Sequence, residues 1–571
     1  MKCGPEELRR RIAVAAGGEP ADLVIRNVTS FSLSSGELLA GDIAIVGDVI
    51  AGIGPGYRGE RELDGAGSVV VPGFIDSHCH VESTLLTPFE FERLALAHGV
   101  TTAVCDPHEL ANVAGAAAVE WFLASAERLR MSLFVQIPSC VPATCLETGG
   151  AELSAEAIAK FRRAERSLGL AEMMNVPGVL GGDPGVLAKL ALWAGANIDG
   201  HAPLLTGRPL DGVLAAGIRN CHECSRLEEA REKLARGMTV LIREGSAARN
   251  LEALAPLLTV ANSPFLAFCC DDRNSLDWRR EGGVDFMVRR ALALGCEPLA
   301  VYRAASWSAA RAFGLADRGL VAPGQRADLV LVDALESGSV RQVVCGGVPV
   351  SEELLAAAEP PPVPEAFAHT VRLEPVTEKD FRIVSQNPET PVIGLIERQI
   401  LTRHLDCTLE IRSGEKLADP GRDILKAAVF ARHGRNRNVG RGFVRGFGLR
   451  RGALASSVGH DSHNLCVVGT NDRDMAVAVN ALIESGGGYA VAAEGVVTAL
   501  LPLEIGGLMS SLPNGEIADR LERLFRAARS LGCRLEDPFE SLAFLPLPVI
   551  PHLRLTDLGV VDVDAFRVLK D

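Results

Sequence analysis

Two histidines with a single residue between them, His78 and His80, are the first candidates for chemistry in this chain. They close an apolar segment, residues 72–80, that reads Pro-Gly-Phe-Ile-Asp-Ser-His-Cys-His. Alternate residues of an extended strand point to the same face, so both imidazoles would face one point, where a divalent metal could bind. A lone H-x-H is better interpreted as two ordinary loop histidines. The side chains that follow along the chain favour a metal site instead.

Further side chains of metal-binding type come at the ends of predicted strands. They are Glu172, His201, His222 and Asp271. With the first two histidines they make four imidazoles and two carboxylates, enough for two divalent ions that share a bridging carboxylate. Taken singly, a strand-end histidine is more often a satisfied polar residue, Glu172 could pair with a cation, and Asp271 could cap a helix. The six residues in this order predict a two-metal enzyme.

The elements that would position these side chains are short apolar runs alternating with helical segments rich in Ala, Leu, Glu and Arg. The predicted strands cover residues 72–78, 101–105, 133–137, 168–173, 197–200, 217–221, 239–242 and 265–270. Eight such units favour a closed, TIM-like (β/α)8 barrel over an open doubly wound sheet. No G-x-G-x-x-G follows the first strand, which also speaks against a dinucleotide-binding fold. In a barrel, chemistry takes place at the carboxyl ends of the strands, where the candidate ligands fall.

Both flanks of the predicted barrel show the alternation of short β-strands. We expect residues 1–71 and 317–356 to form one small composite β domain around a barrel of residues 72–316. Residues 357–369 contain a proline-rich linker, and residues 370–571 are predicted to form a separate C-terminal α/β domain. The predicted fold class is therefore α/β, a (β/α)8 barrel with a composite β domain and a C-terminal α/β domain.

Composition excludes several classes of protein. The formal net charge of −14 argues against a nucleic-acid partner, and no 18-residue apolar stretch predicts a membrane span. The apolar run of residues 12–16 is too short for the core of a signal peptide. The 14 cysteines have no framework spacing, as expected for a reduced, cytoplasmic protein.

The order of the candidate ligands resembles the amidohydrolase superfamily, in which P-G-x-[IV]-D-x-H-x-H closes the first strand. Glu172 stands where most two-metal members have a carboxylated lysine. That substitution, with His-Val-Glu-Ser at 80–83, Asp-Pro-His-Glu-Leu-Ala-Asn-Val at 106–113 and Cys-His-Glu-Cys at 221–224, resembles the bacterial adenine deaminases. Segments 445–453, 460–464, 469–472 and 506–510 resemble the C-terminal domain of the same family. The resemblance covers nearly the whole chain.

The resemblance implies a set of roles for the six ligands. His78, His80 and Asp271 would hold one metal, His201 and His222 the other, and Glu172 would bridge them. Asp271 would also take a proton from the attacking water and pass it to the departing amino group. The implied reaction converts adenine to hypoxanthine and ammonia, a step of purine salvage. The implied cofactor is a pair of divalent ions, with Mn²⁺ first and Fe²⁺ or Zn²⁺ as alternatives, in a homo-oligomer such as a dimer.

Other residues near the predicted strand ends are candidates for holding a purine base. They are His108, Glu109, Arg243, Glu244 and Asp272. For His108 and Glu109, a structural hydrogen bond is an equal alternative. The choice of Asp271 over Asp272 as the ligand rests on alignment to the superfamily pattern.

Three positions depart from the family pattern. Asn274 and Gly283 stand where histidines are expected, and Glu504 stands where proline is usual. The first two leave open an alternative substrate, another aminated heterocycle or a cyclic amide. A non-catalytic metal-binding paralogue is the rival of a different class. The segment 460–463, His-Asp-Ser-His, could host another metal or line the barrel mouth.

Overall fold

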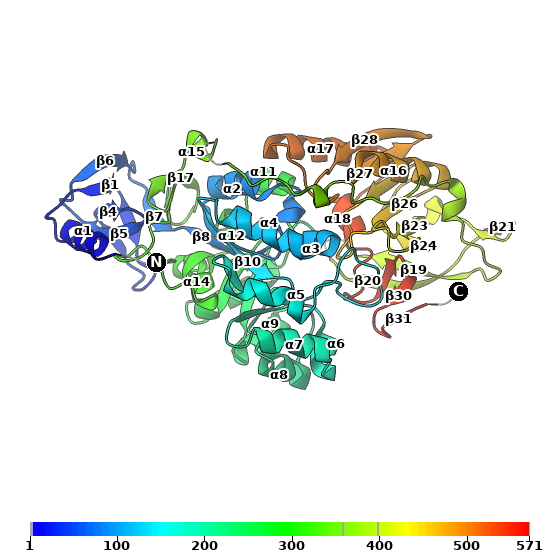
Figure 1. Cartoon of the computed structure of the whole chain (residues 1–571), viewed down its shortest axis with the longest axis horizontal. Coiled ribbons are helices and arrows are strands. Elements are labelled where there is room, and N and C mark those ends of the chain that lie inside the picture. Colours follow the sequence, from blue (N-terminus) through cyan, green and yellow to red (C-terminus); the bar gives the residue numbers. More distant parts are fainter. Residues whose placement is uncertain (1–3, 357–358, 397–398, 570–571) are drawn as a thin grey trace.

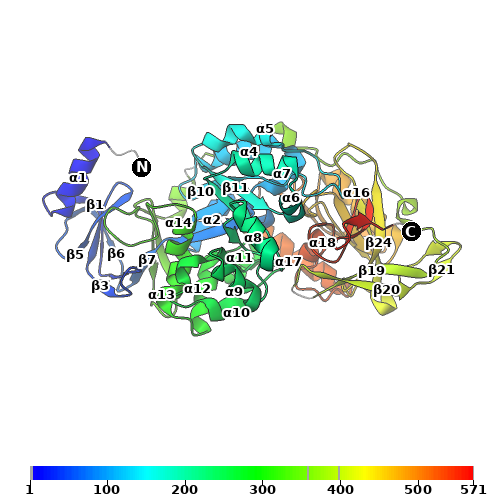
Figure 2. The same cartoon turned by 90° about the horizontal axis from the view of Figure 1, so that it is seen from below.

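The computed structural model describes residues 4–356, 359–396 and 399–569. The molecule is elongated, with the N-terminal strands at one end, the parallel strands in the middle and the C-terminal region, residues 370–569, at the other end (Figures 1 and 2). No helix among these residues is long and apolar enough to cross a membrane.

Parallel strands occupy the middle of the molecule, and each predicted strand overlaps an observed one. They are β8 (Phe74–Cys79), β9 (Val100–Cys105), β10 (Ser132–Ile137), β11 (Ser167–Met173), β12 (Asn197–Gly200), β13 (Asn220–Cys221), β14 (Thr239–Arg243) and β15 (Leu266–Cys269). They form a five-stranded sheet in the order β12-β11-β10-β9-β8 and a three-stranded sheet in the order β13-β14-β15. All neighbours within both sheets are parallel, so their carboxyl ends share one edge.

Hydrogen bonds join the two parallel sheets on both sides. Between β12 and β13, the amide of Arg219 donates to the carbonyl of Ile198 at 3.2 Å. Between β15 and β8, the amide of Asp271 donates to the carbonyl of His78 at 2.9 Å, and the Ser77 hydroxyl donates to the carbonyl of Phe268 at 2.6 Å. The parallel sheet is therefore curled, which is consistent with a TIM-like fold.

Helix α2 (Pro88–Ala97) shows how local sequence sets the connections between strands. The Thr87 hydroxyl accepts a hydrogen bond from the amide of Glu90, and Pro88 occupies the first turn, where its missing N–H costs nothing. After the helix, Gly99 has a φ of 78° and turns the chain into β9. A side chain there would lie 3.0 Å from the ring of Phe74, so the turn requires glycine.

The chain before and after the parallel strands contributes to one antiparallel-rich sheet. Strand β7 (Val69–Pro72) pairs with β16 (Leu329–Val332) in the order β18-β17-β16-β7-β2-β3. The outer strands are β2 (Thr29–Phe31), β3 (Leu38–Ala40), β17 (Val340–Cys345) and β18 (Val348–Pro349). A second sheet, in the order β5-β4-β1-β6, contains β1 (Ala21–Arg26), β4 (Asp42–Val46), β5 (Val49–Gly54) and β6 (Gly59–Asp64).

The C-terminal region is built on an eight-stranded sheet in the order β20-β19-β24-β23-β26-β25-β27-β28. Its strands are β19 (Glu389–Leu395), β20 (Thr402–Thr408), β23 (Ile424–Phe430), β24 (Val439–Arg445), β25 (Ala453–Ser456), β26 (Leu465–Gly469), β27 (Gly488–Ala493) and β28 (Val496–Pro502). Helix α16 (Asp472–Ser485) buries Met475, Val479 and Leu482 against this sheet. Of the predicted proline-rich linker 357–369, residues 357 and 358 lie outside the described residues, and 359–364 form neither helix nor strand.

A buried ion-pair cluster ties the parallel strands to the C-terminal region. Glu109 lies in α3 (His108–Ala114), directly after β9, and is 2% exposed. Its carboxylate accepts a hydrogen bond from His460 Nδ1 at 2.6 Å and another from His463 Nε2. Burial by itself lowers the pKa of His460, but the charges of Glu109 and Asp272 outweigh burial and raise it to about 10.

We expect Glu109→Gln to destabilise the protein by about 3 kcal/mol at neutral pH, because a buried imidazolium then loses its counter-charge. The raised folded-state pKa makes this contribution complete below about pH 6.5, the unfolded value, and removes it as the pH rises through about 10. The difference between the unfolding midpoints of wild type and variant should therefore shrink as the pH rises from about 6.5 to about 10. Thermal unfolding followed by circular dichroism at several pH values measures the gap.

The matched control is Glu120→Gln, since Glu120 pairs with Lys160 at a surface where both side chains are 55% exposed. It should change stability by less than about 0.5 kcal/mol at every pH. A gap for Glu109→Gln that stays constant from neutral to alkaline pH contradicts the ion-pair assignment.

Candidate active site

A cavity of about 320 Å³ lies where the parallel strands end and face the C-terminal region. Polar and ionisable side chains make up most of its lining. From the strand ends and the loops after them come His80, His108, Glu109, Glu172, Met174, His201, His222, Glu223, Arg243, Asp271 and Asp272. From the C-terminal region come Ile400, His460, Asp461, Phe544 and Leu547. Such a concentration of ionisable groups in one buried place is typical of a catalytic or metal-binding site.

The end of β8 brings two imidazoles to the carboxylate of Asp271. Asp271 Oδ1 lies 3.4 Å from His78 Nε2 and 3.2 Å from His80 Nε2. Asp271 follows β15 with a φ of 53°, in the left-handed region that few residues other than glycine adopt. His80 Nδ1 donates to the carbonyl of Asp106 at 2.9 Å, so its Nε2 carries a free lone pair toward the cavity.

The ends of β11, β12 and β13 bring together the remaining predicted ligands. Glu172 Oε2 lies 2.6 Å from His201 Nδ1 and 3.4 Å from His222 Nε2. Its other oxygen, Oε1, lies 3.4 Å from His80 Nε2 and 3.7 Å from His78 Nε2. The Glu172 carboxylate therefore stands between the two groups of imidazoles, with one oxygen toward each.

These residues have the composition and spacing of a divalent metal site. All six predicted ligands are between 1% and 6% exposed. Potential ligand atoms of His78, His222 and Asp271 lie within 4.8 Å of one another, as do those of Glu172, His201 and His222. His201 Nε2 is buried without a hydrogen-bond partner among the described residues. Nitrogen and oxygen donors without a thiolate suit manganese, iron or zinc.

Arg243, at the end of β14, organises the acidic side of the site. It donates to Asp271 Oδ2 at 2.8 Å and to both oxygens of Glu223. Burial by itself raises the pKa of Asp271, but the charges of His222 and Arg243 outweigh burial and hold it well below its usual range. Arg243, which was predicted to hold substrate, thus lines the cavity and also orients the carboxylate of Asp271. Glu223 is a site residue that the analysis of the sequence missed, although it follows a predicted ligand directly.

Of the other residues predicted to contact substrate, His108 and Asp272 line the cavity and Glu244 does not. The His108 ring lies between Glu172 and Asp461, with Nδ1 3.6 Å from Glu172 Oε1 and Nε2 3.7 Å from Asp461 Oδ1. Asp272 lines the cavity and accepts a hydrogen bond from the Ser83 hydroxyl at 2.5 Å. Glu244 does not line it, and its carboxylate accepts from the amide of Leu251 at the start of α10 (Leu251–Leu254).

The positions that depart from the family pattern lie outside the cavity lining. Asn274 caps α11 (Ser275–Glu281) and donates to Asp537 at 2.8 Å. Gly283 packs against the ring of Trp278, where an added Cβ would lie only 2.1 Å from the ring. Glu504 accepts hydrogen bonds from Ser510 and Ser511. The structure therefore connects these departures with local packing and contacts between regions.

The C-terminal region forms one wall of the cavity, and lining of the barrel mouth was one of the two alternatives that the sequence left open for segment 460–463. His460 and Asp461 line this wall and His463 contacts Glu109, whereas Ser462 does not line the cavity. The rings of Phe544 and His460 stack with centroids 4.4 Å apart and an interplanar angle of 23°. Apolar wall residues such as Phe544 and Leu547 carry no motif, so only the tertiary contact identifies them.

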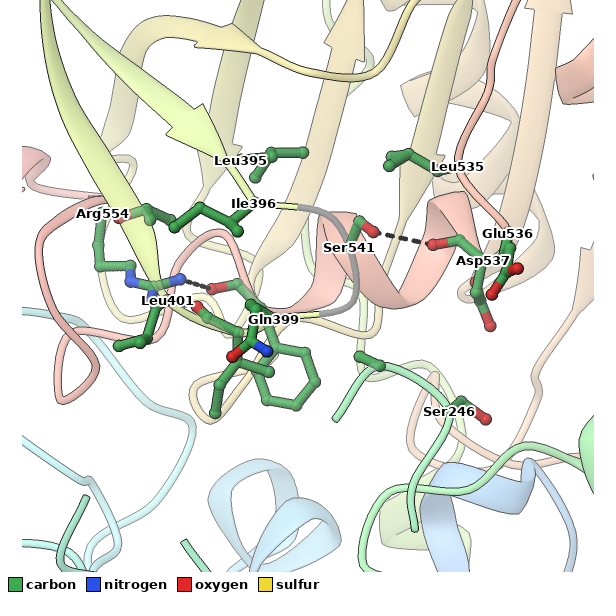
Figure 3. A pocket seen from close by; sticks show the side chains of 14 residues that line it. Ser246, Leu395, Ile396, Gln399, Leu401, Leu535, Glu536, Asp537, Ser541 and Arg554 are labelled. Carbon is green, nitrogen blue, oxygen red and sulfur yellow. Dashed lines mark hydrogen bonds between the residues drawn. The ribbon is translucent and has the colours of Figure 1, made fainter. Parts of the chain in front are cut away.

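A second cavity, of about 600 Å³, adjoins the first and shares Ile400 and Phe544 with it (Figure 3). It lies between Ser246, which follows β14, and the C-terminal region. Arg554 donates to the carbonyl of Ile400 at 2.5 Å, which anchors the backbone of that shared residue. The shared side chains separate the ionisable cavity from the larger one.

Comparisons with known proteins agree with this geometry. Residues 69–350 match the amidohydrolase family, and residues 399–567 match the adenine deaminase C-terminal domain. The chain is 55% identical over 557 residues to an adenine deaminase of Gluconobacter oxydans, covering 97% of this chain and 98% of that protein. It is 55% identical over 566 residues to an adenine deaminase of Methylobacterium nodulans, covering 99% and 100%.

A third relative, adenine deaminase 1 of Agrobacterium fabrum, is 50% identical over 562 residues, or 98% of this chain and 97% of that protein. These likenesses span the parallel strands, both flanks and the C-terminal region together. They include the strand ends that carry the six buried ligands and the segment that closes the cavity from the other side. The chain belongs to the adenine deaminase family of amidohydrolases.

Proposed function

We propose that this protein hydrolyses adenine to hypoxanthine and ammonia in the cavity at the strand ends. The observation that carries the proposal is the convergence of four imidazoles and two carboxylates, all nearly fully buried, on one point. The 55% identity to proteins named adenine deaminase, over nearly the full length of the chain, supports adenine as the substrate. The reaction would serve purine salvage, on a small-molecule base in the cytoplasm.

The six buried ligands would hold two divalent ions, with Mn²⁺ as our first assignment and Fe²⁺ or Zn²⁺ as alternatives. His78, His80 and Asp271 would hold one ion, His201 and His222 the other, and Glu172 would bridge them. Such a pair, when bound, lowers the pKa of a water molecule and polarises the ring carbon under attack. The position of the Glu172 carboxylate, with one oxygen toward each group, supports the bridging role.

Asp271 is the residue of this chain best placed to move a proton. It is held ionised by its neighbours, so it can accept a proton from the attacking water. It then delivers that proton to the exocyclic nitrogen, because an amine on an aromatic ring leaves readily only when protonated. In the balanced reaction, a C–O bond forms at C6, the C–N bond breaks, and ammonia departs. Arg243 keeps the carboxylate oriented through its 2.8 Å hydrogen bond.

For the architecture, we infer that the eight parallel strands form one closed (β/α)8 barrel of residues 72–316. The hydrogen bonds between β12 and β13 and between β15 and β8 support this. Residues 1–71 and 317–356 would make the composite β domain, and the pairing of β7 with β16 supports that division. Residues 370–571 would be the C-terminal domain. From the family resemblance we also infer that the protein forms a homo-oligomer such as a dimer.

Purified protein reconstituted with Mn²⁺ should release ammonia from adenine and contain about two metal ions per chain. Ammonia release and metal content are to be measured on the same sample. Two bound metals without adenine turnover would contradict adenine as the substrate but would still agree with the metal site. A protein that binds no divalent metal would contradict the site itself.

Glu172→Ala should lose metal as well as activity, because the carboxylate between the imidazole groups is removed. Elemental analysis after gel filtration should find well under two ions per chain. Glu92→Gln is the matched control, since Glu92 is also buried but accepts from the amide of Met131, away from the cavity. Retention of two ions by Glu172→Ala would rule out the bridge.

Asp271→Asn should fold normally but lower kcat by about 10²–10⁴-fold, the usual worth of a positioned general acid–base group. Asp272→Asn should be much less affected, because the Asp272 carboxylate accepts from Ser83, whereas Asp271 has an oxygen within 3.4 Å of both His78 and His80. Steady-state kinetics on both variants decides between them. A silent Asp271→Asn beside an inactive Asp272→Asn would shift the assignment by one residue.

A further inference from the structure

The wall that the C-terminal region contributes to the cavity contains a buried carboxylate oxygen without a partner. Asp461 is 2% exposed and lines the cavity. Its Oδ1 lies 3.7 Å from His108 Nε2, whereas Oδ2 makes no hydrogen bond to any residue that the structure describes. A buried acceptor left unpaired is costly, so a hydrogen-bond donor from outside the chain is expected to reach it.

Three apolar side chains line the same cavity as this oxygen, beside the ionisable ones. Ile400, Phe544 and Leu547 line the same wall, and the ring of Phe544 stacks on that of His460. An aromatic ring in a cavity that also holds an unpaired polar acceptor suits a planar heterocycle, which stacks through its face and hydrogen-bonds through its edge. The wall thus has the character of a binding surface for a purine base.

The position of Asp461 relative to the metal-type ligands determines which edge of a base it would meet. His108 stands between them, with Nδ1 3.6 Å from Glu172 Oε1 and Nε2 3.7 Å from Asp461 Oδ1. A base whose reacting carbon lies at Glu172 and Asp271 therefore extends its far edge toward Asp461. In adenine the edge far from C6 carries N3 of the six-membered ring and N9 of the five-membered ring, and N9 bears an N–H in the free base.

We propose that Asp461 accepts a hydrogen bond from the imidazole N–H of the purine and thereby selects free bases over N-substituted purines. This inference rests on the proposed function and assigns a specificity determinant to the C-terminal region. An N–H bound to a carboxylate makes a strong, charge-assisted hydrogen bond. A nucleoside has no such N–H, and its sugar would need the space that Ile400, Phe544 and Leu547 occupy.

Two other roles compete with this one: support of the wall, and a metal site that Asp461 would share with His108 and Glu109, because potential ligand atoms of the three residues lie within 4.8 Å of one another. The buried carboxyl of Glu147 is the relevant neighbour, and burial followed by the charge of Asp461 raises its pKa well above the usual range. Asp461 Oδ2 has no hydrogen-bond partner among the described residues, so Glu147 supplies none. A test must therefore separate recognition of the purine edge from support of the wall.

The test compares adenine with 9-methyladenine, which lacks an imidazole N–H, in the metal-loaded full-length enzyme. For wild type, kcat/KM for 9-methyladenine should be lower by about 10³-fold or more, since sites built around a buried hydrogen bond reject analogues that lack it. Asp461→Ala should lower kcat/KM for adenine by about 10²-fold, mainly through KM, because a binding contact is lost. Its discrimination between the two substrates should fall by a similar factor.

Asp461→Asn keeps a side-chain oxygen acceptor and should restore part of the discrimination that Asp461→Ala loses. Ser462→Ala is the control, since Ser462 belongs to the same segment but does not line the cavity. It should leave the ratio of the two substrates unchanged. Metal content of every variant is measured alongside, and should match that of wild type.

The outcomes separate the two proposals. If Asp461→Ala lowers kcat/KM for both substrates by the same factor, Asp461 supports the wall and the inference is overturned. Equal use of both substrates by wild type also overturns it, because no N–H is then being read. If the metal-loaded wild type releases no ammonia from adenine, the proposed function fails and this inference falls with it.

Discussion

The structure depends on one electrostatic constraint, the burial of two carboxylates among four imidazoles at the ends of parallel strands. Charged groups are expensive to bury unless each finds a partner of opposite charge. Glu172 and Asp271 satisfy this by standing between the imidazoles, and Arg243 adds a cation on the far side of Asp271. The curled parallel sheet makes the arrangement possible, because all of its strands end at one edge.

The same constraint explains the need for the C-terminal region. A site at the open edge of a sheet would be exposed to water, which would weaken each of these interactions. His460, Asp461 and Phe544 close it, and the pairing of Glu109 with His460 and His463 fixes the closing wall. These two contacts of Glu109 therefore hold the regions together and close the cavity.

Much of this arrangement could be predicted from local sequence. Each of the eight predicted strands overlaps an observed strand, since a parallel strand buried on both faces is built from a short, mostly apolar run. The spacing of His78 and His80 predicts that both side chains point to the same face, because alternate residues of an extended chain do so. The prediction was less informative for Arg243 and Glu244, neighbours at one strand end, because a change in loop direction sends one to Asp271 and the other to Leu251.

The sequence by itself determined the strands, the order of the ligand side chains and the family, because periodicity and spacing are properties of nearby residues. Only the tertiary structure decided how Glu172 stands between its imidazoles, and which residues form the opposite wall. Asp461 lies 190 residues beyond Asp271, the last strand-end ligand, and Phe544 lies 273 residues beyond it, so no local pattern relates them. Their roles arise from the packing of one region against another, which brings distant side chains into contact in three dimensions.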